Sequence, residues 1–71
     1  MSRFEKNILE GKTALITGAG GILGPRHAKA LASVGANLIL LDISEKNLRA
    51  VEKNIRDEFS SINIDTYIAD I

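Results

Sequence analysis

Four glycines stand close together between an apolar run and a stretch typical of a helix. They are Gly18, Gly20, Gly21 and Gly24, and Thr17 precedes them. Glycine has no Cβ, so it adopts positive φ and lets the backbone come close to a ligand. We therefore expect Gly18 and Gly20 to build a tight turn and Gly21 to leave room for a pyrophosphate. Gly24 then lets the following helix pack on the strand.

The residue after the last of these glycines indicates where the helix begins. Pro25 follows Gly24, and proline is favoured at the first helical position because its missing N–H would have no intrahelical partner there. The first turn of a helix carries unpaired N–H groups and the positive end of the helix dipole, which together can hold a diphosphate. A triphosphate-binding loop is disfavoured, because Pro25 and Arg26 stand where that loop needs a lysine and a hydroxyl residue.

A carboxylate follows at the end of the next apolar run. Asp42 comes directly after residues 37–41, roughly 20 residues beyond the glycines, as a dinucleotide-binding unit requires. A carboxylate there can accept hydrogen bonds from the adenosine ribose, and its charge repels the 2′-phosphate that distinguishes NADP from NAD. The predicted cofactor is therefore NAD. Two simpler interpretations stay open: Asp42 only ends the strand and caps the next helix, or the glycines form a turn that binds no ligand.

The elements that must position these groups alternate in the order β-α-β-α-β. We expect strands at 12–17, 37–41 and 62–70, and helices at 25–34 and 45–59. Successive right-handed crossovers give the strand order 3-2-1 and put both helices on one face of a parallel sheet. The expected fold is thus α/β, a Rossmann-like parallel sheet forming the N-terminal part of a doubly wound, three-layer fold. Because its other face would be bare, we expect residues 1–71 to be an incomplete N-terminal part of one dinucleotide-binding domain.

Composition argues against several other functions. Nine basic and nine acidic side chains cancel, so no net charge attracts nucleic acid or an anionic membrane. The chain has no cysteine, and its single histidine, His27, cannot form a histidine cluster, so we expect no metal site. It also lacks the ~18 apolar residues of a membrane span and the apolar core of a secretory signal. We therefore expect a cytoplasmic protein.

Several segments together carry a family resemblance. They are residues 11–24 (GKTALITGAGGILG), residues 30–37 (ALASVGAN), Asp42, and residues 69–71 (ADI). With them, nearly the whole chain resembles the opening third of the short-chain dehydrogenase/reductase family, whose members are NAD(P)-dependent Rossmann-fold oxidoreductases. The resemblance implies hydride transfer between NAD and an alcohol or carbonyl group of a small-molecule substrate. It also implies that the parent protein is a homo-oligomer.

The resemblance further implies which residues meet the cofactor. Thr17 would support the glycine turn, while the backbone around residues 20–23 would meet the pyrophosphate. Asp42 would bind the ribose, with Ile43 beside the adenine. Asp70 would bond the adenine amino group, and the residue after it would make a backbone contact nearby. The expected cofactor-binding residues are Thr17, Gly18, Gly20, Gly21, Ile22, Leu23, Gly24, Asp42, Ile43, Asp70 and Ile71.

Three positions bear on the subfamily or on the cofactor. The commonest members read T-G-x-x-x-G-x-G, and Ile22 stands at their middle glycine. The pattern T-G-x-x-G-x-x-G, through Gly21, is instead that of extended members that act on nucleotide sugars. NADP-preferring members tend to carry a basic residue where Gly21 or Ile43 stands here, so the resemblance also favours NAD.

The family's catalytic groups fall outside this chain. Its serine, its Tyr-x-x-x-Lys pair and its Asn-Ala-Gly segment would follow Ile71, and Tyr67 does not replace them because Ile71 stands where the lysine is needed. No catalytic residue is therefore expected here. Two alternatives to the dehydrogenase stay open. One is an extended-type nucleotide-sugar epimerase or dehydratase, and the other is a regulatory protein that senses NAD without chemistry.

Overall fold

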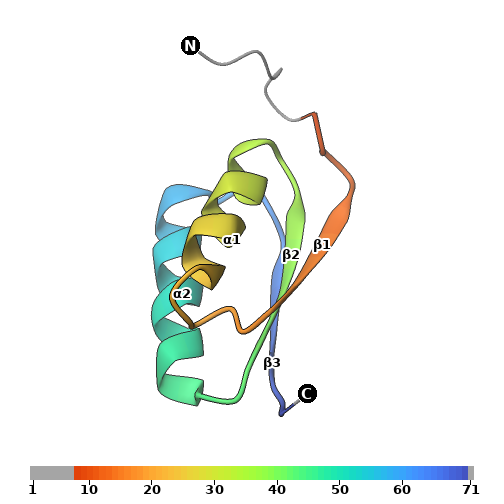
Figure 1. The fold of residues 1–71 in the computed structure, drawn as a ribbon. Coiled ribbons are helices and arrows are strands. Elements are labelled where there is room, and N and C mark those ends of the chain that lie inside the picture. Colours follow the sequence, from red (N-terminus) through yellow and green to blue (C-terminus); the bar gives the residue numbers. More distant parts are fainter. Residues whose placement is uncertain (1–7, 71) are drawn as a thin grey trace.

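A computed structural model describes residues 8–70 of the chain as strands and helices in strict alternation. The elements are β1 (Thr13–Thr17), α1 (Gly24–Ser33), β2 (Asn37–Asp42), α2 (Glu45–Glu58) and β3 (Ile64–Ile68). All three strands are parallel, and β2 lies between β1 and β3. This is the order 3-2-1 that the sequence predicts, read from the opposite edge (Figure 1).

The helices begin and end close to the predicted residues, for local reasons. The hydroxyl of Ser44 accepts a hydrogen bond from the N–H of Asn47 (3.2 Å) and so caps the start of α2. Helix α1 stops before Gly35, whose φ of +92° no side chain favours and whose N–H donates to the carbonyl of Ala32 (3.0 Å). The third strand is shorter than predicted, because it begins at Ile64 rather than at residue 62.

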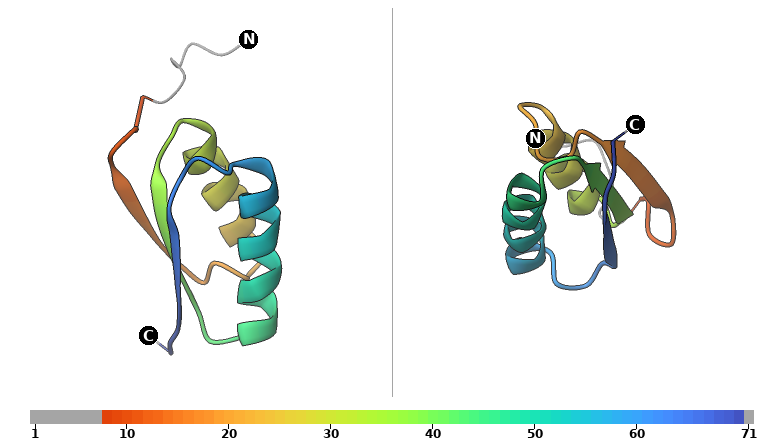
Figure 2. Two further views of the ribbon diagram at one scale, coloured as in Figure 1. Left: turned by 180° about the vertical axis from the view of Figure 1, so that it is seen from behind. Right: turned by 90° about the horizontal axis from the view of Figure 1, so that it is seen from below.

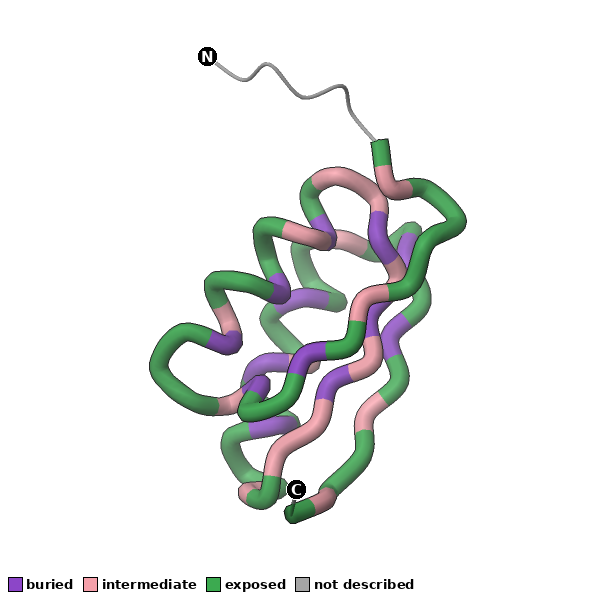
Figure 3. Tube along the Cα trace, turned by 45° about the vertical axis from the view of Figure 1, so that its right-hand side comes forward, coloured by how far each residue is buried: buried purple, intermediate pink, exposed green. Residues whose placement is uncertain are grey.

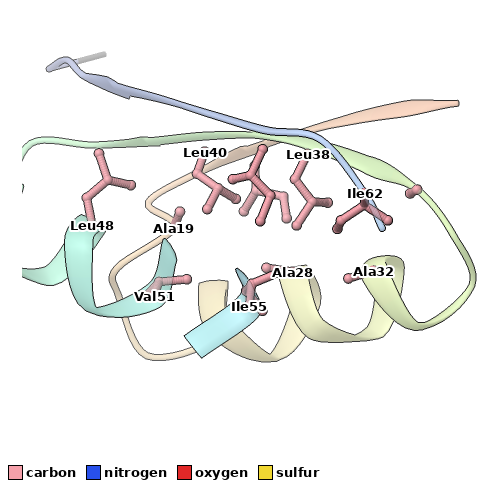
Figure 4. Packing of buried hydrophobic residues seen from close by; sticks show 12 residues of the cluster. Ala19, Ala28, Ala32, Leu38, Leu40, Leu48, Val51, Ile55 and Ile62 are labelled. Carbon is pink, nitrogen blue, oxygen red and sulfur yellow. The ribbon is translucent and has the colours of Figure 1, made fainter. Parts of the chain in front are cut away.

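Both helices pack on the same face of the sheet, as the crossover rule predicts (Figure 2). Leu48, Val51 and Ile55 form the buried stripe of α2, and α1 contributes the small side chains of Ala28 and Ala32. Figure 4 shows these residues meeting the inward-facing side chains of β2. The buried core consists of Ile16, Ala19, Ala28, Ala32, Ala36, Leu38, Leu40, Leu48, Val51, Ile55, Ile62 and Ile64.

The opposite face of the sheet carries exposed apolar side chains. Leu15 is 61% exposed and Tyr67 is 57% exposed. The parallel register places Thr17, Leu41 and Tyr67 side by side across the three strands. Figure 3 shows exposed and intermediate residues between the buried ones along the strands. Tyr67 is therefore a residue of the open sheet face.

Residues 8–70 contain neither a membrane-spanning helix nor a cluster of metal-ligating side chains. No helix in this part of the chain combines the length and the apolar character that a membrane crossing needs. The same residues contain no group of three or more His, Asp or Glu side chains that could hold a metal ion.

Candidate dinucleotide site

A cavity of about 290 Å³ lies where the carboxyl ends of the three strands meet. These ends share one edge of the sheet because all three strands run in the same direction. Thr17 and Asp42 are the last residues of β1 and β2, and Asp70 follows β3. The cavity is lined by Thr17, Gly18, Leu41, Asp42, Ile43, Ala69 and Asp70.

The glycine loop, residues 18–24, leaves the sheet through one left-handed residue. Gly18 has a φ of +63°, and its carbonyl accepts a hydrogen bond from the N–H of Gly21 (2.9 Å). The N–H of Ala19 donates to the carbonyl of Leu41 on β2 (2.9 Å). Gly18 therefore builds the turn as predicted, whereas Gly20 is not among the glycines with positive φ.

Gly20 is required for a close approach rather than for its backbone angle. A Cβ at this position would lie 2.6 Å from the Cβ of Asn47 and 3.2 Å from Oδ2 of Asp42. Real Cβ atoms do not come so close to other atoms, so only glycine lets the loop rest against the first turn of α2. The loop, β2 and α2 thus meet at Gly20.

Gly24 has a different neighbour from the one expected. A Cβ on this buried residue would lie 2.6 Å from the carbonyl oxygen of Ala19 and closer still to that of Gly18. The sequence predicts that this glycine lets helix pack on strand, but its tightest contacts are with the carbonyls of its own loop. The absent side chain therefore allows the start of α1 to fold back over the turn.

The start of α1 offers free donors. No side chain caps it, and Leu23 is its N-cap residue. Within residues 8–70, the N–H groups of Ile22 and Leu23 donate no hydrogen bond, whereas those of Ala19, Gly20 and Gly21 are all used within the protein. The free amides thus belong to the later part of the predicted 20–23 segment. With the helix dipole behind them, they form a site suited to an anion.

Asp42 is the carboxylate of this edge that bonds to the glycine loop. Its Oδ1 accepts from the N–H of Ser44 (2.7 Å), and its Oδ2 accepts from the N–H of Gly20 (2.8 Å). The Ser44 bond, followed by the Gly20 bond, holds the pKa of Asp42 below its ordinary value despite partial burial. The carboxylate is therefore charged at neutral pH. Each oxygen keeps acceptor capacity for a further donor.

The simpler interpretation of Asp42 as a strand end and helix cap is only part of its role. Ser44, not Asp42, is the N-cap of α2. Asp42 does end β2, but its carboxylate also reaches the glycine loop, which is 22 residues away in sequence. Binding of a dinucleotide would exclude the interpretation of the glycines as a turn without a ligand.

The other predicted residues border the same cavity or the loop. Ile43 is exposed beside Asp42, and Asp70 is exposed at the far wall. Ile22 stands in place of the family's middle glycine. Its side chain is 93% exposed and therefore points away from the turn. Within residues 8–70, the hydroxyl of Thr17 makes no hydrogen bond to the loop, although Thr17 lines the cavity. Ile71 lies outside the described residues.

Two cavity residues were absent from the predicted set. Leu41 pairs with Thr17 in the sheet, and Ala69 donates its N–H to the carbonyl of Asp42 (3.1 Å). The signal that could have found Leu41 is the parallel register, because residues at the same level of neighbouring strands share a face. Apolar residues at a strand end have no chemical signature of their own.

Comparison with known proteins agrees with this geometry. The family model described as short chain dehydrogenase matches residues 12–71. The trans-4-hydroxycyclohexanecarboxylate dehydrogenase of Sinomonas cyclohexanicum is 41% identical over 61 residues, which are 86% of this chain and 23% of that protein. The human inactive hydroxysteroid dehydrogenase-like protein 1 is 37% identical over 60 residues, which are 84% of this chain and 18% of that protein.

Solved structures with each nicotinamide cofactor are also similar. A metagenomic short-chain oxidoreductase in complex with NADP has a TM-score of 0.75 and 31% identity, covering 86% of this chain and 27% of its own. A candidate D-mannonate oxidoreductase from Haemophilus influenza, with NAD bound, has a TM-score of 0.76 and 37% identity, covering 92% and 22%. The chain therefore spans about a quarter or less of the length of the relatives it matches.

The family follows from the extent of the match together with the fold. The matched region, residues 12–71, contains every strand and helix described above. Its parallel strands, its glycine loop and the acidic end of β2 occur in the order that the sequence predicts. The chain belongs to the short-chain dehydrogenase family.

Proposed function

We propose that this chain binds the adenosine and pyrophosphate of NAD(H), in a protein that transfers hydride between NAD and an alcohol or carbonyl group of a small molecule. One observation carries the proposal. Free backbone N–H groups at the start of α1 lie on the same edge of the sheet as the charged carboxylate of Asp42. A dinucleotide requires an anion site for its pyrophosphate beside a carboxylate that accepts hydrogen bonds from its ribose hydroxyls.

The pyrophosphate is assigned to the end of the glycine loop. The amides of Ile22 and Leu23 are free within the described part of the chain, and helix α1 points its positive end at them. Gly21 itself places no side chain over the turn, where a Cβ would lie 3.2 Å from the carbonyl oxygen of Gly18. The remaining loop glycines, Gly18, Gly20 and Gly24, keep the loop in the shape that exposes these donors.

The adenosine is assigned to the cavity. Asp42 would accept from the ribose hydroxyls, with Ile43 along one face of the adenine and Asp70 at its amino group. Thr17 forms part of the cavity wall, and Ile71 completes the set that the family resemblance implies. These assignments give the predicted cofactor-binding residues of the described part of the chain a place in one proposed site.

The preference for NAD rests on charge. A 2′-phosphate on the ribose would approach the carboxylate of Asp42, whose negative charge is stabilised by the N–H groups of Ser44 and Gly20. Like charges repel, and no basic residue stands at Gly21 or Ile43 to compensate. Among the similar structures, one binds NAD and another NADP, so this preference depends on Asp42 itself.

Catalysis would belong to the rest of the protein. When bound, the nicotinamide supplies the hydride acceptor or donor, and the residues of this chain hold, orient and select the cofactor. The exposed apolar face of the sheet and the small share of each relative that is matched support residues 1–71 as the N-terminal part of one dinucleotide-binding domain. The family resemblance adds a homo-oligomer to the proposal, and the cytoplasmic location expected from the sequence stays part of it.

A second function is favoured by one specific relative. The human protein that is 37% identical to this chain is named as inactive. A protein that binds NAD without hydride transfer would need the same loop and the same carboxylate. The extended-type epimerase has less support, because the matched family model and the relatives described above are dehydrogenases or oxidoreductases.

Calorimetric titration of the full-length protein with NAD, NADH and NADP tests the proposal. We expect NAD and NADH to bind. NADP should bind more weakly by about tenfold or more, a difference of about 1.4 kcal/mol, because its 2′-phosphate meets the charge of Asp42. Absence of any dinucleotide binding would refute the proposal, and equal affinity for NAD and NADP would refute the role given to Asp42. Reduction of NAD by a panel of secondary alcohols then separates an enzyme from a sensor.

A further inference from the structure

The carboxylate of Asp42 is already engaged without any ligand. Its Oδ2 accepts the N–H of Gly20 at 2.8 Å, and this bond joins the middle of the glycine loop to the end of β2. Its Oδ1 accepts the N–H of Ser44 at 2.7 Å, which ties the same side chain to the start of α2. One carboxylate thus connects a loop, a strand and a helix.

The loop has few other attachments at this point. Ala19 donates to Leu41, but the bond from Gly21 to Gly18 stays inside the loop. Beyond Gly21, the amides of residues 22 and 23 make no hydrogen bond within the described residues. The bond from Gly20 is therefore the last one that links the loop to β2 before the amides that face the proposed pyrophosphate site.

The packing around Gly20 has the same effect. The space that a Cβ would fill is bordered by Asn47 and by Oδ2 of Asp42. The carboxylate and the first turn of α2 thus both pack against the loop backbone. A shift of the loop away from β2 would break the charge-assisted bond and open this contact.

We propose that Asp42 is a positioning residue that holds the glycine loop in its binding-ready shape before the cofactor arrives. This role is separate from the acceptance of ribose hydroxyls, and its consequence for NAD rests on the function proposed above. A preorganised loop spends less free energy on ordering when the ligand binds. Loss of Asp42 would therefore weaken the pyrophosphate site as well as the ribose site.

The two roles are compatible because a carboxylate has about four acceptor positions on its two oxygens. The N–H groups of Ser44 and Gly20 use one position on each oxygen. The remaining positions suit the two hydroxyls of a ribose. Asp42 can therefore keep its hold on the loop while it accepts the cofactor.

Hydrogen exchange resolved by NMR tests the positioning role in the full-length, cofactor-free protein. In the unmodified protein, the Gly20 amide should exchange more slowly than the free amide of Ile22. Asp42→Ala should speed exchange at Gly20 by about tenfold or more, as expected for one lost charge-assisted bond. Ser44→Ala is the matched control: it removes the cap of α2 but leaves the carboxylate and its backbone donors in place.

The exchange result decides the proposal in either direction. Equal exchange at Gly20 and Ile22 in the unmodified protein, after correction for intrinsic rates, would overturn it even if Asp42→Ala does not fold. Unchanged exchange at Gly20 in a folded Asp42→Ala would overturn it as well. Neither measurement needs NAD. If the protein bound no dinucleotide, the proposed function would be refuted, and hydrogen exchange would still decide the positioning role.

An NAD analogue without the two hydroxyls of its adenosine ribose separates the two roles of Asp42. If the side chain only gripped the ribose, Asp42→Ala would not change the affinity for this analogue. With the positioning role, the variant should bind the analogue several-fold more weakly than the unmodified protein does, because the loop must be ordered on binding. Equal affinities of the folded proteins for the analogue would overturn the proposed consequence for cofactor binding.

Discussion

The carboxyl edge and the amino edge of the sheet are built from similar parts. The amino edge has a cavity of about 410 Å³, larger than the 290 Å³ at the carboxyl edge. Gly11 and Gly35 turn there with φ of +83° and +92°, as Gly18 does at the other edge. Asn37 accepts the N–H of Asn63 through Oδ1 (2.9 Å), much as Asp42 accepts that of Gly20.

The edges differ in which helix ends they receive and in the charge of the side chain that links two segments. Both helices begin at the carboxyl edge and end at the amino edge, because each returns antiparallel to the strands (Figure 1). Unpaired N–H groups therefore gather at one edge and helix carbonyls at the other. The linking side chain is a carboxylate at the carboxyl edge and a neutral amide at the amino edge. Helix polarity and charge, rather than cavity size, thus identify the candidate site.

The largest difference between the edges should appear when each loses a glycine. A Cβ at Gly24 meets backbone oxygens, whereas a Cβ at Gly11 meets nothing within 4 Å. Gly24→Ala should destabilise the protein by about 3 kcal/mol and abolish measurable NAD binding, because the loop must move. Gly11→Ala should cost only about 1 kcal/mol for its positive φ. Thermal melting and NAD titration of both variants measure these effects. If Gly24→Ala bound NAD as tightly as the unmodified protein, the glycine loop would not be the part of the carboxyl edge that binds the cofactor.

The next effect concerns the two linking side chains. Asp42→Ala should weaken NAD binding by roughly tenfold to a hundredfold, since hydrogen bonds to a charged acceptor are lost, and should relax discrimination against NADP. Asn37→Ala removes the equivalent link at the amino edge and should lower stability by about 1 kcal/mol with NAD affinity unchanged. Titration with both cofactors measures these changes. Equal losses of NAD affinity in the two variants would show that Asp42 acts only through stability.

The pH dependence sharpens the contrast, because Asn37 does not titrate. The N–H groups of Ser44 and Gly20 hold the pKa of Asp42 below its ordinary value of 3.8, so folding favours the charged form. Its contribution to stability is complete above the unfolded pKa and is lost as the pH falls through the lower folded pKa. Urea unfolding should show a constant difference between the unmodified protein and Asp42→Ala from neutral pH to about 5, shrinking below about 4.

Glu52 also titrates in this range and must be controlled. Burial raises the pKa of Glu52, but hydrogen bonds from Arg56 and Arg49 outweigh it and lower the pKa overall. The pH series is therefore run in a Glu52→Gln background as well. If the stability difference caused by Asp42→Ala persisted unchanged to a pH of about 2 in this background, it would contradict the assigned shift.

The smallest effect is expected away from both edges. The carboxylate of Glu52 on α2 forms salt bridges with Nη1 of Arg49 (2.8 Å) and Nη2 of Arg56 (2.9 Å). Arg56 also donates a hydrogen bond to the carbonyl of Ile64 on β3. Glu52→Gln should cost about 0.5–1 kcal/mol, since the pairs are partly exposed, and should leave NAD affinity unchanged. Chemical unfolding at neutral pH and NAD titration measure the two quantities. If Glu52→Gln changed NAD affinity as much as Asp42→Ala does, the affinity would depend on the position of α2 as a whole rather than on Asp42.

Most of the fold could be predicted from the sequence because its signals are local. The alternation of apolar runs with a helical stripe through Leu48, Val51 and Ile55 predicts the elements, and the crossover rule predicts that both helices share a face. The start of β3 could not be predicted in the same way. Ile62 continues the apolar alternation and is buried, yet the ladder begins at Ile64, because burial alone does not require strand pairing.

The sequence predicts the residues that line the cavity except Leu41 and Ala69, but it does not predict the contacts among them. The spacing from the glycines to Asp42 predicts that they share one dinucleotide site, and the structure brings them to one edge of the sheet. It does not predict that Gly20 is pressed against Asn47, or that Gly24 folds against its own loop. Those contacts depend on how closely α2 approaches the loop, and the distance between segments far apart in sequence leaves no local pattern.

The sequence by itself determined the order of the elements, the position of the turn and the presence of a carboxylate at the end of β2. These depend on side-chain periodicity and on backbone freedom, both of which act over a few residues. Only the tertiary structure decided which loop amides are used and which stay free. An N–H group is satisfied or left open by the acceptor that reaches it, and the acceptor for Gly20 comes from a residue 22 positions away.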